Sequence, residues 1–128
     1  MKLLLDTHIW LWLTIDPGRL RKHTSAILKD QANELWLSPI NTWEALTLHW
    51  KRRIFLSDQL RDWVAVATKG LQEAPVTHEI MIEARQFELH QDPADRILAA
   101  TAKVLDLTLV TADTRLLGLG SIRTLNNY

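Results

Sequence analysis

The order of apolar and polar residues along the chain predicts short buried strands that alternate with helices. Residues 2–5, 35–37 and 107–110 are short apolar runs of the kind found in a buried parallel sheet. Between these runs, apolar residues recur at helical spacing, and breaker residues such as Asp16-Pro17-Gly18 separate the segments. Strands that alternate with helices are typical of a mostly parallel sheet covered by helices. The pattern therefore predicts an α/β fold.

Capping residues set the limits of several predicted helices. Ser38-Pro39 provides an N-cap followed by proline at the first helical position, and Asp92-Pro93 opens a later helix. Ser57 is expected to cap a further helix that ends at Gly70. The remaining predictions are helices over 8–15, 20–31 and 77–88, a short helix after Asp113, and candidate strands over 71–76 and 122–125.

Composition restricts the class of protein. The 128 residues fit one domain, and the absence of cysteine excludes disulfides and thiolate metal sites. The apolar start meets Asp6 before a signal-peptide core could form, and no run approaches the roughly 20 apolar residues of a membrane span, so we expect a soluble cytoplasmic protein with no membrane contact. The 15 basic and 15 acidic residues cancel, which argues against a protein whose main role is to coat nucleic acid.

Carboxylates occur where the predicted strands end and helices begin. Asp6 and Asp113 follow strands, Glu44 lies early in the helix after the strand over 35–37, and Asp95 lies in the first turn of the helix opened by Asp92. Ligands of parallel sheets bind beyond the carboxyl ends of the strands. Two carboxylates about 4 Å apart repel by about 4 kcal/mol at an effective dielectric near 20, and a hard divalent cation such as Mg²⁺ or Mn²⁺ removes that repulsion. The acids therefore predict a metal site suited to phosphodiester hydrolysis by an activated water.

Each of these acids also has a structural interpretation when it is taken alone. Asp92 is a good N-cap, and the helix dipole favours Asp95 three residues later. Asp113 could equally cap the short helix that follows it. Asp6 and Glu44 are harder to explain in this way, because Asp6 adjoins buried apolar segments and Glu44 lies on a mixed helical face. The prediction depends on the four acids as a set.

Four segments resemble a known family. Residues 3–8, 38–45, 92–102 and 109–113 are similar to the successive motifs of PIN-domain proteins, particularly the VapC-type toxins of bacterial toxin–antitoxin pairs. The motifs occur in order over nearly the whole chain, which makes the resemblance specific. It implies a single PIN domain over residues 1–128, with a three-layer α/β/α fold around a mostly parallel sheet of four to five strands. It also implies a Mg²⁺- or Mn²⁺-dependent endoribonuclease.

The resemblance carries a set of site residues with it. It implies a metal site made of Asp6, Glu44, Asp95 and Asp113, with Asp6 and Asp95 as the most direct ligands. Asp92 keeps the role of helix cap. Thr7 and Thr111 are candidates for holding the carboxylates or a metal-bound water through their hydroxyl groups.

Partners are also implied. The family predicts an RNA substrate, a VapB-like antitoxin that covers the active-site groove, and a homodimer. Trp10 and Trp12 exceed what one core-facing stripe needs and so favour an interface, although they could equally fill the space between sheet and helix. The basic clusters 19–22 and 51–53 could guide an RNA backbone or simply be solvated helix ends.

Other functions fit the sequence less well. The main alternative is a catalytically silent PIN-like protein-interaction domain, against which the retention of all four acids argues. A receiver-type phosphorylated aspartate switch needs an acidic neighbour of Asp6 and a lysine after a late strand, and both are missing. A dehalogenase-type phosphatase needs a second aspartate where His8 stands. The RNA that is cleaved and the number of metal ions stay open.

Overall fold

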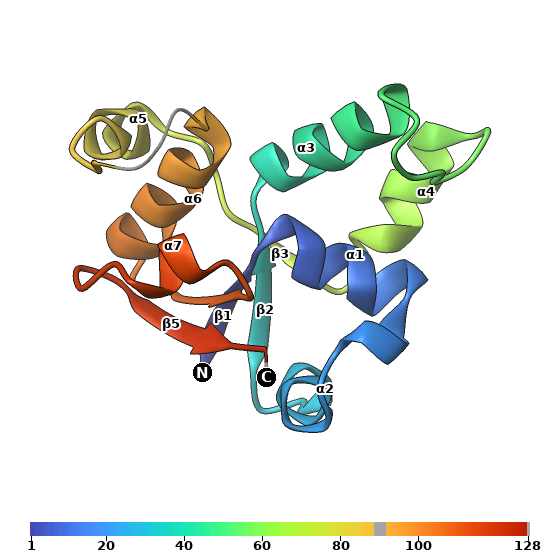
Figure 1. Cartoon of the computed structure of the whole chain (residues 1–128), viewed down its shortest axis with the longest axis horizontal. Coiled ribbons are helices and arrows are strands. Elements are labelled where there is room, and N and C mark those ends of the chain that lie inside the picture. The colour runs from blue at the N-terminus through green and yellow to red at the C-terminus, as the bar shows by residue number, and fades with distance from the viewer. Residues whose placement is uncertain (89–91, 128) are drawn as a thin grey trace.

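A five-stranded parallel sheet forms the centre of the molecule. The computed structural model describes residues 1–88 and 92–127 (Figure 1). The strand order is β3-β2-β1-β4-β5, and every neighbouring pair is parallel. The strands are β1 (Lys2–Leu5), β2 (Glu34–Leu37), β3 (Gln72–Glu73), β4 (Thr108–Thr111) and β5 (Arg123–Asn126). The predicted α/β fold with a mostly parallel sheet of four to five strands is confirmed.

Helices cover both faces of this sheet. Figure 1 shows α5 and α6 on one side and α1, α2 and α4 on the other, with α3 rising from the end of β2. The helices in the described ranges are α1 (Thr7–Ile15), α2 (Lys22–Lys29), α3 (Pro39–Trp50), α4 (Leu60–Ala67), α5 (His78–Ala84), α6 (Pro93–Val104) and α7 (Thr114–Leu117), together with a 3₁₀ turn at Pro17–Arg19. None of these helices combines the length and hydropathy needed to cross a bilayer.

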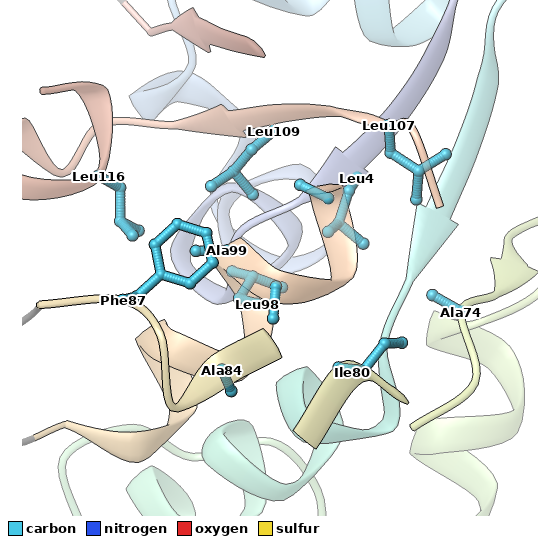
Figure 2. Packing of buried hydrophobic residues seen from close by; sticks show 12 residues of the cluster. Leu4, Ala74, Ile80, Ala84, Phe87, Leu98, Ala99, Leu107, Leu109 and Leu116 are labelled. Atoms are coloured by element: carbon cyan, nitrogen blue, oxygen red, sulfur yellow. The ribbon is translucent and has the colours of Figure 1, made fainter. Parts of the chain in front are cut away.

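The two faces of the sheet bury two separate apolar clusters. Leu4 and Leu109 point to the face covered by α5 and α6, whereas Leu3, Leu5 and Val110 point to the opposite face. This alternation follows from the two-residue period of a strand. Figure 2 shows side chains of the first cluster from the sheet and from both helices pointing toward one another. The central strand β1 is apolar from Leu3 to Leu5 because both of its faces are covered.

Several predicted element limits are wrong. The helix expected to be capped by Ser57 has Gln59 as its N-cap, while the Ser57 hydroxyl accepts a hydrogen bond from the Gln59 N–H in the preceding turn. The candidate strand over 71–76 is reduced to two residues, since only Gln72 and Glu73 find a partner strand in β2. The helix predicted through residue 88 ends at Ala84, and Phe87 instead turns into the apolar cluster under α6.

The two tryptophans of α1 differ in their environment. Trp10 is fully buried, packs against Trp63 and donates its indole N–H to the Ala67 carbonyl at 2.9 Å. It is a core residue, so the expectation of an interface is wrong for Trp10. Trp12 is half-buried, and the Arg19 guanidinium lies 5.1 Å from its ring centre.

Candidate active site

The predicted site residues gather at the carboxyl edge of the sheet. Asp6 follows β1 directly and is the N-cap of α1, and Asp113 lies two residues beyond β4 as the N-cap of α7. Asp95 lies in the first turn of α6, and Glu44 lies in the second turn of α3. Each acid is thus positioned by the end of a strand or by one of the first two turns of a helix.

Three carboxylates form the tightest cluster. Glu44, Asp92 and Asp95 each offer a ligand oxygen, and these oxygens all lie within 4.8 Å of one another. Asp92 was expected only to cap α6, and its Oδ1 does accept the Ala94 N–H at 3.0 Å. Asp92 therefore serves as a cap and as a member of the acidic cluster. The spacing Asp92-x-x-Asp95 could have indicated this, because it brings both residues to the first turn of one helix.

Asp6 is held by two hydrogen bonds beside this cluster. The Thr111 hydroxyl donates to Oδ2 at 2.6 Å, and the Thr7 backbone N–H donates to Oδ1 at 2.7 Å. Asp6 is only 8% exposed, and burial raises the pKa of its carboxyl although these two hydrogen bonds oppose the rise. A neighbouring positive charge would favour the ionised form of this carboxyl.

A buried hydrogen-bond chain fixes the position of Glu44. The Thr7 hydroxyl donates to Glu44 Oε1 at 2.5 Å and accepts from the Asn41 side-chain amide at 2.9 Å. The Oδ1 atom of Asn41 in turn accepts the Ser38 N–H at 2.9 Å, which closes a capping box at the start of α3. Sequence reasoning missed Asn41, whose only signal was its place three residues after Ser38. This chain joins the starts of α1 and α3.

Burial and the neighbouring acids change the ionisation of Glu44. Burial first and then the charges of Asp6, Asp92 and Asp95 raise the pKa of Glu44 from 4.5 to about 7, while the Thr7 hydrogen bond lowers it. Of the four acids predicted as a set, Asp6 and Asp95 therefore act on Glu44, together with Asp92, which was expected only as a helix cap.

Asp113 is paired with a cation from its own helix. The Arg115 guanidinium donates to both carboxylate oxygens of Asp113, at 3.2 Å and 2.9 Å, and lies 4.0 Å from Asp95 Oδ2. These contacts, the Asp113 hydrogen bond first, raise the pKa of Arg115. Arg115 was not among the residues predicted from the sequence. Its signal was a basic residue two positions after a helix cap.

Comparison with known proteins identifies the family. Residues 3–120 match the family described as the PIN domain. The chain belongs to the PIN-domain family. This PIN domain is 30% identical over 115 residues, 88% of each chain, to Ribonuclease VapC22 of Mycobacterium tuberculosis, and it is thus a VapC-type member.

Solved structures agree with this PIN fold. VapBC2 from Rickettsia felis, bound to a DNA fragment from its promoter, superimposes with a TM-score of 0.72 at 17% identity over 98% of each chain. The M. tuberculosis toxin VapC20, described as cleaving the sarcin–ricin loop, superimposes with a TM-score of 0.65 at 16% identity over 94% of this chain and 96% of its own. At these identities the likeness supports the fold alone.

A groove of about 710 Å³ runs beside the acidic cluster of the PIN domain. It is lined by the start of α1 at Thr7 and His8, by one face of α3 and by the first turns of α6. Acidic side chains, Glu44 and Asp92, and basic side chains, Lys51 and Arg53, both line it.

The acidic cluster has the chemistry of a site for a divalent metal ion. Its ligand atoms are carboxylate oxygens, which Mg²⁺ and Mn²⁺ prefer over nitrogen or sulfur. Their separations, within 4.8 Å, allow one ion to contact all three residues Glu44, Asp92 and Asp95. A cation there would also offset the burial and the repulsion that keep Glu44 partly protonated at neutral pH. The three residues of the cluster therefore suit a bound Mg²⁺ or Mn²⁺ ion.

Proposed function

We propose that this PIN-domain protein is an endoribonuclease that uses Mg²⁺ or Mn²⁺ and acts as the toxin of a VapBC-type toxin–antitoxin pair. The convergence of Glu44, Asp92 and Asp95 carries the proposal, because it gathers hard oxygen ligands beside an open groove. The VapC-type relative supports an activity on RNA, since its name is that of a ribonuclease.

Some of the residues are proposed to bind the ion, and others orient those ligands. A bound divalent ion would activate a water and stabilise the charge that develops at phosphorus. Glu44, Asp92 and Asp95 are the proposed nearest ligands, and Asp6 and Asp113 complete the acidic shell. Thr7 and Thr111 orient Glu44 and Asp6 through the hydrogen bonds described above. Asn41 keeps the Thr7 hydroxyl directed toward Glu44 by donating to its oxygen.

The enzyme activity has a direct test with a matched control. The purified protein should cleave RNA when Mg²⁺ or Mn²⁺ is added and should stop when EDTA is added. Asp95→Asn and Asp6→Asn should each abolish cleavage while the far-UV circular dichroism stays unchanged. Asp62→Asn is the control, because Asp62 occupies the third position of α4 as Asp95 does in α6 but is exposed outside the groove. Full activity in Asp6→Asn or Asp95→Asn would refute the assignment.

The partners belong to the same proposal. The solved structures that share this fold include toxin–antitoxin complexes, which favours a VapB-like antitoxin for this chain. A homodimer is the second part of the proposal. Exposed apolar side chains, including Trp50 at 78% and Phe55 at 67%, offer surface for such contacts. Co-expression with the product of a neighbouring short gene should yield a stable complex. Light scattering of the purified chain alone should give twice the mass of one chain.

The toxin role has a separate test. If expression of the chain without that gene product is harmless to growth, the toxin role is wrong and the nuclease role stands.

A further inference from the structure

One face of α3 lines the groove over the whole length of the helix. The residues that contribute recur at spacings of three and four, which places them on a single stripe. They are Ile40, Trp43, Glu44, Thr47, Leu48 and Lys51. Along this stripe Lys51 follows Glu44 by two turns, and Arg53 also lines the groove. The groove therefore carries basic side chains as well as the acidic ones.

The separation of the acidic and basic residues along α3 suits a strand of nucleic acid. Lys51 follows Glu44 by seven positions, which corresponds to about 10 Å along a helix axis. Lys51 and Arg53 are both exposed, so their charges can meet a ligand without prior rearrangement. A phosphate held at the acidic cluster by a metal ion would leave the next phosphates of the strand within reach of these two cations. Charge complementarity thus favours a polyanion as the occupant of the groove.

Trp43 gives this groove an aromatic surface. Its side chain is 60% exposed and lines the groove one position before Glu44. A tryptophan exposed to this extent contributes little to the core, and the face of an indole ring is a platform on which any base can stack. Aromatic surface next to paired cations is the usual composition of a site for single-stranded nucleic acid.

We propose that the groove between α3 and α6 holds a single RNA strand, with Trp43 stacked on a base and Lys51 and Arg53 neutralising phosphates next to the one that is cleaved. The proposal rests on the proposed ribonuclease function and adds the path of the substrate to it. Because the chain has no net charge, RNA affinity must come from a local cationic patch, and these two residues supply it in the lining of the groove.

Binding can be measured apart from cleavage. Fluorescence anisotropy with a labelled single-stranded RNA of about 12 nucleotides, in EDTA and over a series of KCl concentrations, reports the affinity and its dependence on salt. The test variant is Lys51→Gln with Arg53→Gln. The matched control is Lys22→Gln with Lys29→Gln, which removes the same charge from exposed positions on α2, at the opposite end of the molecule in Figure 1.

The expected result follows from counterion release. Each phosphate contact on a single strand contributes about 0.7 to the slope of log affinity against log salt, so the test variant should lose about 1.4 from that slope and roughly 25-fold in affinity at about 0.1 M salt. Trp43→Ala should weaken binding about fivefold or more without changing the slope, since stacking releases no counterions. With metal present, the Lys51/Arg53 variant should cleave with a raised KM and an unaltered kcat.

The outcomes separate this proposal from the function on which it rests. Equal losses in the test and control variants would overturn the assigned path and indicate general electrostatic attraction. Normal RNA binding by the test variant, together with failure to bind the antitoxin, would overturn it in favour of a protein occupant. If the wild-type protein fails to cleave RNA with metal present but the predicted losses of binding occur, the proposed function fails and the RNA path stands.

Discussion

Replacing Glu44 with glutamine should make the metal-free protein more stable at alkaline pH. In the folded protein the pKa of Glu44 is about 7 instead of 4.5, because burial and the neighbouring acids oppose its ionisation. Glutamine carries no charge and can still accept the Thr7 hydroxyl hydrogen bond. The substitution therefore removes the repulsion and keeps the contact that positions the side chain.

The sign and size of the effect follow from proton linkage. Between about pH 4.5 and pH 7 the folded protein holds a proton on Glu44 that the unfolded chain releases, so the free energy of unfolding falls as pH rises through this range. A shift from 4.5 to about 7 corresponds to at most about 3–4 kcal/mol at 1.36 kcal/mol per pKa unit. Glu44 is only partly buried, and screening by solvent reduces this to about 1–2 kcal/mol.

Thermal unfolding in EDTA measures the difference. At about pH 8 Glu44→Gln should melt roughly 3–8 °C above the wild type, and near pH 5 the two proteins should nearly coincide. Glu79→Gln is the control, because it makes the same exchange at an exposed position outside the site, in the first turn of α5. Saturating Mn²⁺ should reverse the order at pH 8, since the ion stabilises the folded state that binds it better. Parallel pH profiles for Glu44→Gln and wild type in EDTA would refute the reasoning.

Three further substitutions test the surroundings of the site. Arg115→Gln should tighten Mn²⁺ binding measured by calorimetry, because the guanidinium on Asp113 no longer competes with the ion; unchanged or weaker binding would contradict this. Thr111→Val should raise the pKa of Asp6 further and so weaken Mn²⁺ binding more at pH 6 than at pH 8, and an equal loss at both values would argue against it. Asn41→Ala should lower the free energy of unfolding by about 2–3 kcal/mol in urea titrations, because it strands the buried Ser38 N–H, and a change within about 0.5 kcal/mol would show that the capping box contributes little.

Much of the fold was predictable because its signals are local. Apolar runs gave three of the strands, and caps such as Ser38, Thr77 and Asp92 gave the starts of helices. The prediction was wrong where two signals compete in one short segment. Ser57 resembles a helix cap but serves the turn before α4, and β3 is short because only two of its residues find a partner in β2.

The site was predictable as a set of acids but not as a geometry. Strand exits and helix starts indicated that Asp6, Glu44, Asp95 and Asp113 share one edge, since parallel strands end together. Sequence spacing does not show which carboxylates come closest, because that depends on how α3 and α6 pack. Asp92 was predicted only as a helix cap, because capping explains an aspartate at that position without any further role. The structure also places it beside Glu44. The metal roles of these residues and the extent of a single domain over residues 1–128 stay predictions.

Three of the acids at this edge are also the residues that begin helices. Asp6, Asp92 and Asp113 each accept a backbone N–H of the helix that follows, in α1, α6 and α7. Loss of the whole side chain would therefore cost folding as well as chemistry, at about 1 kcal/mol for each cap. Asparagine and serine cap helices nearly as well as aspartate but cannot supply its charge. A homologue that no longer needs catalysis would thus tolerate asparagine or serine at these positions and keep its fold. Such exchanges would therefore distinguish an inactive homologue from an active nuclease.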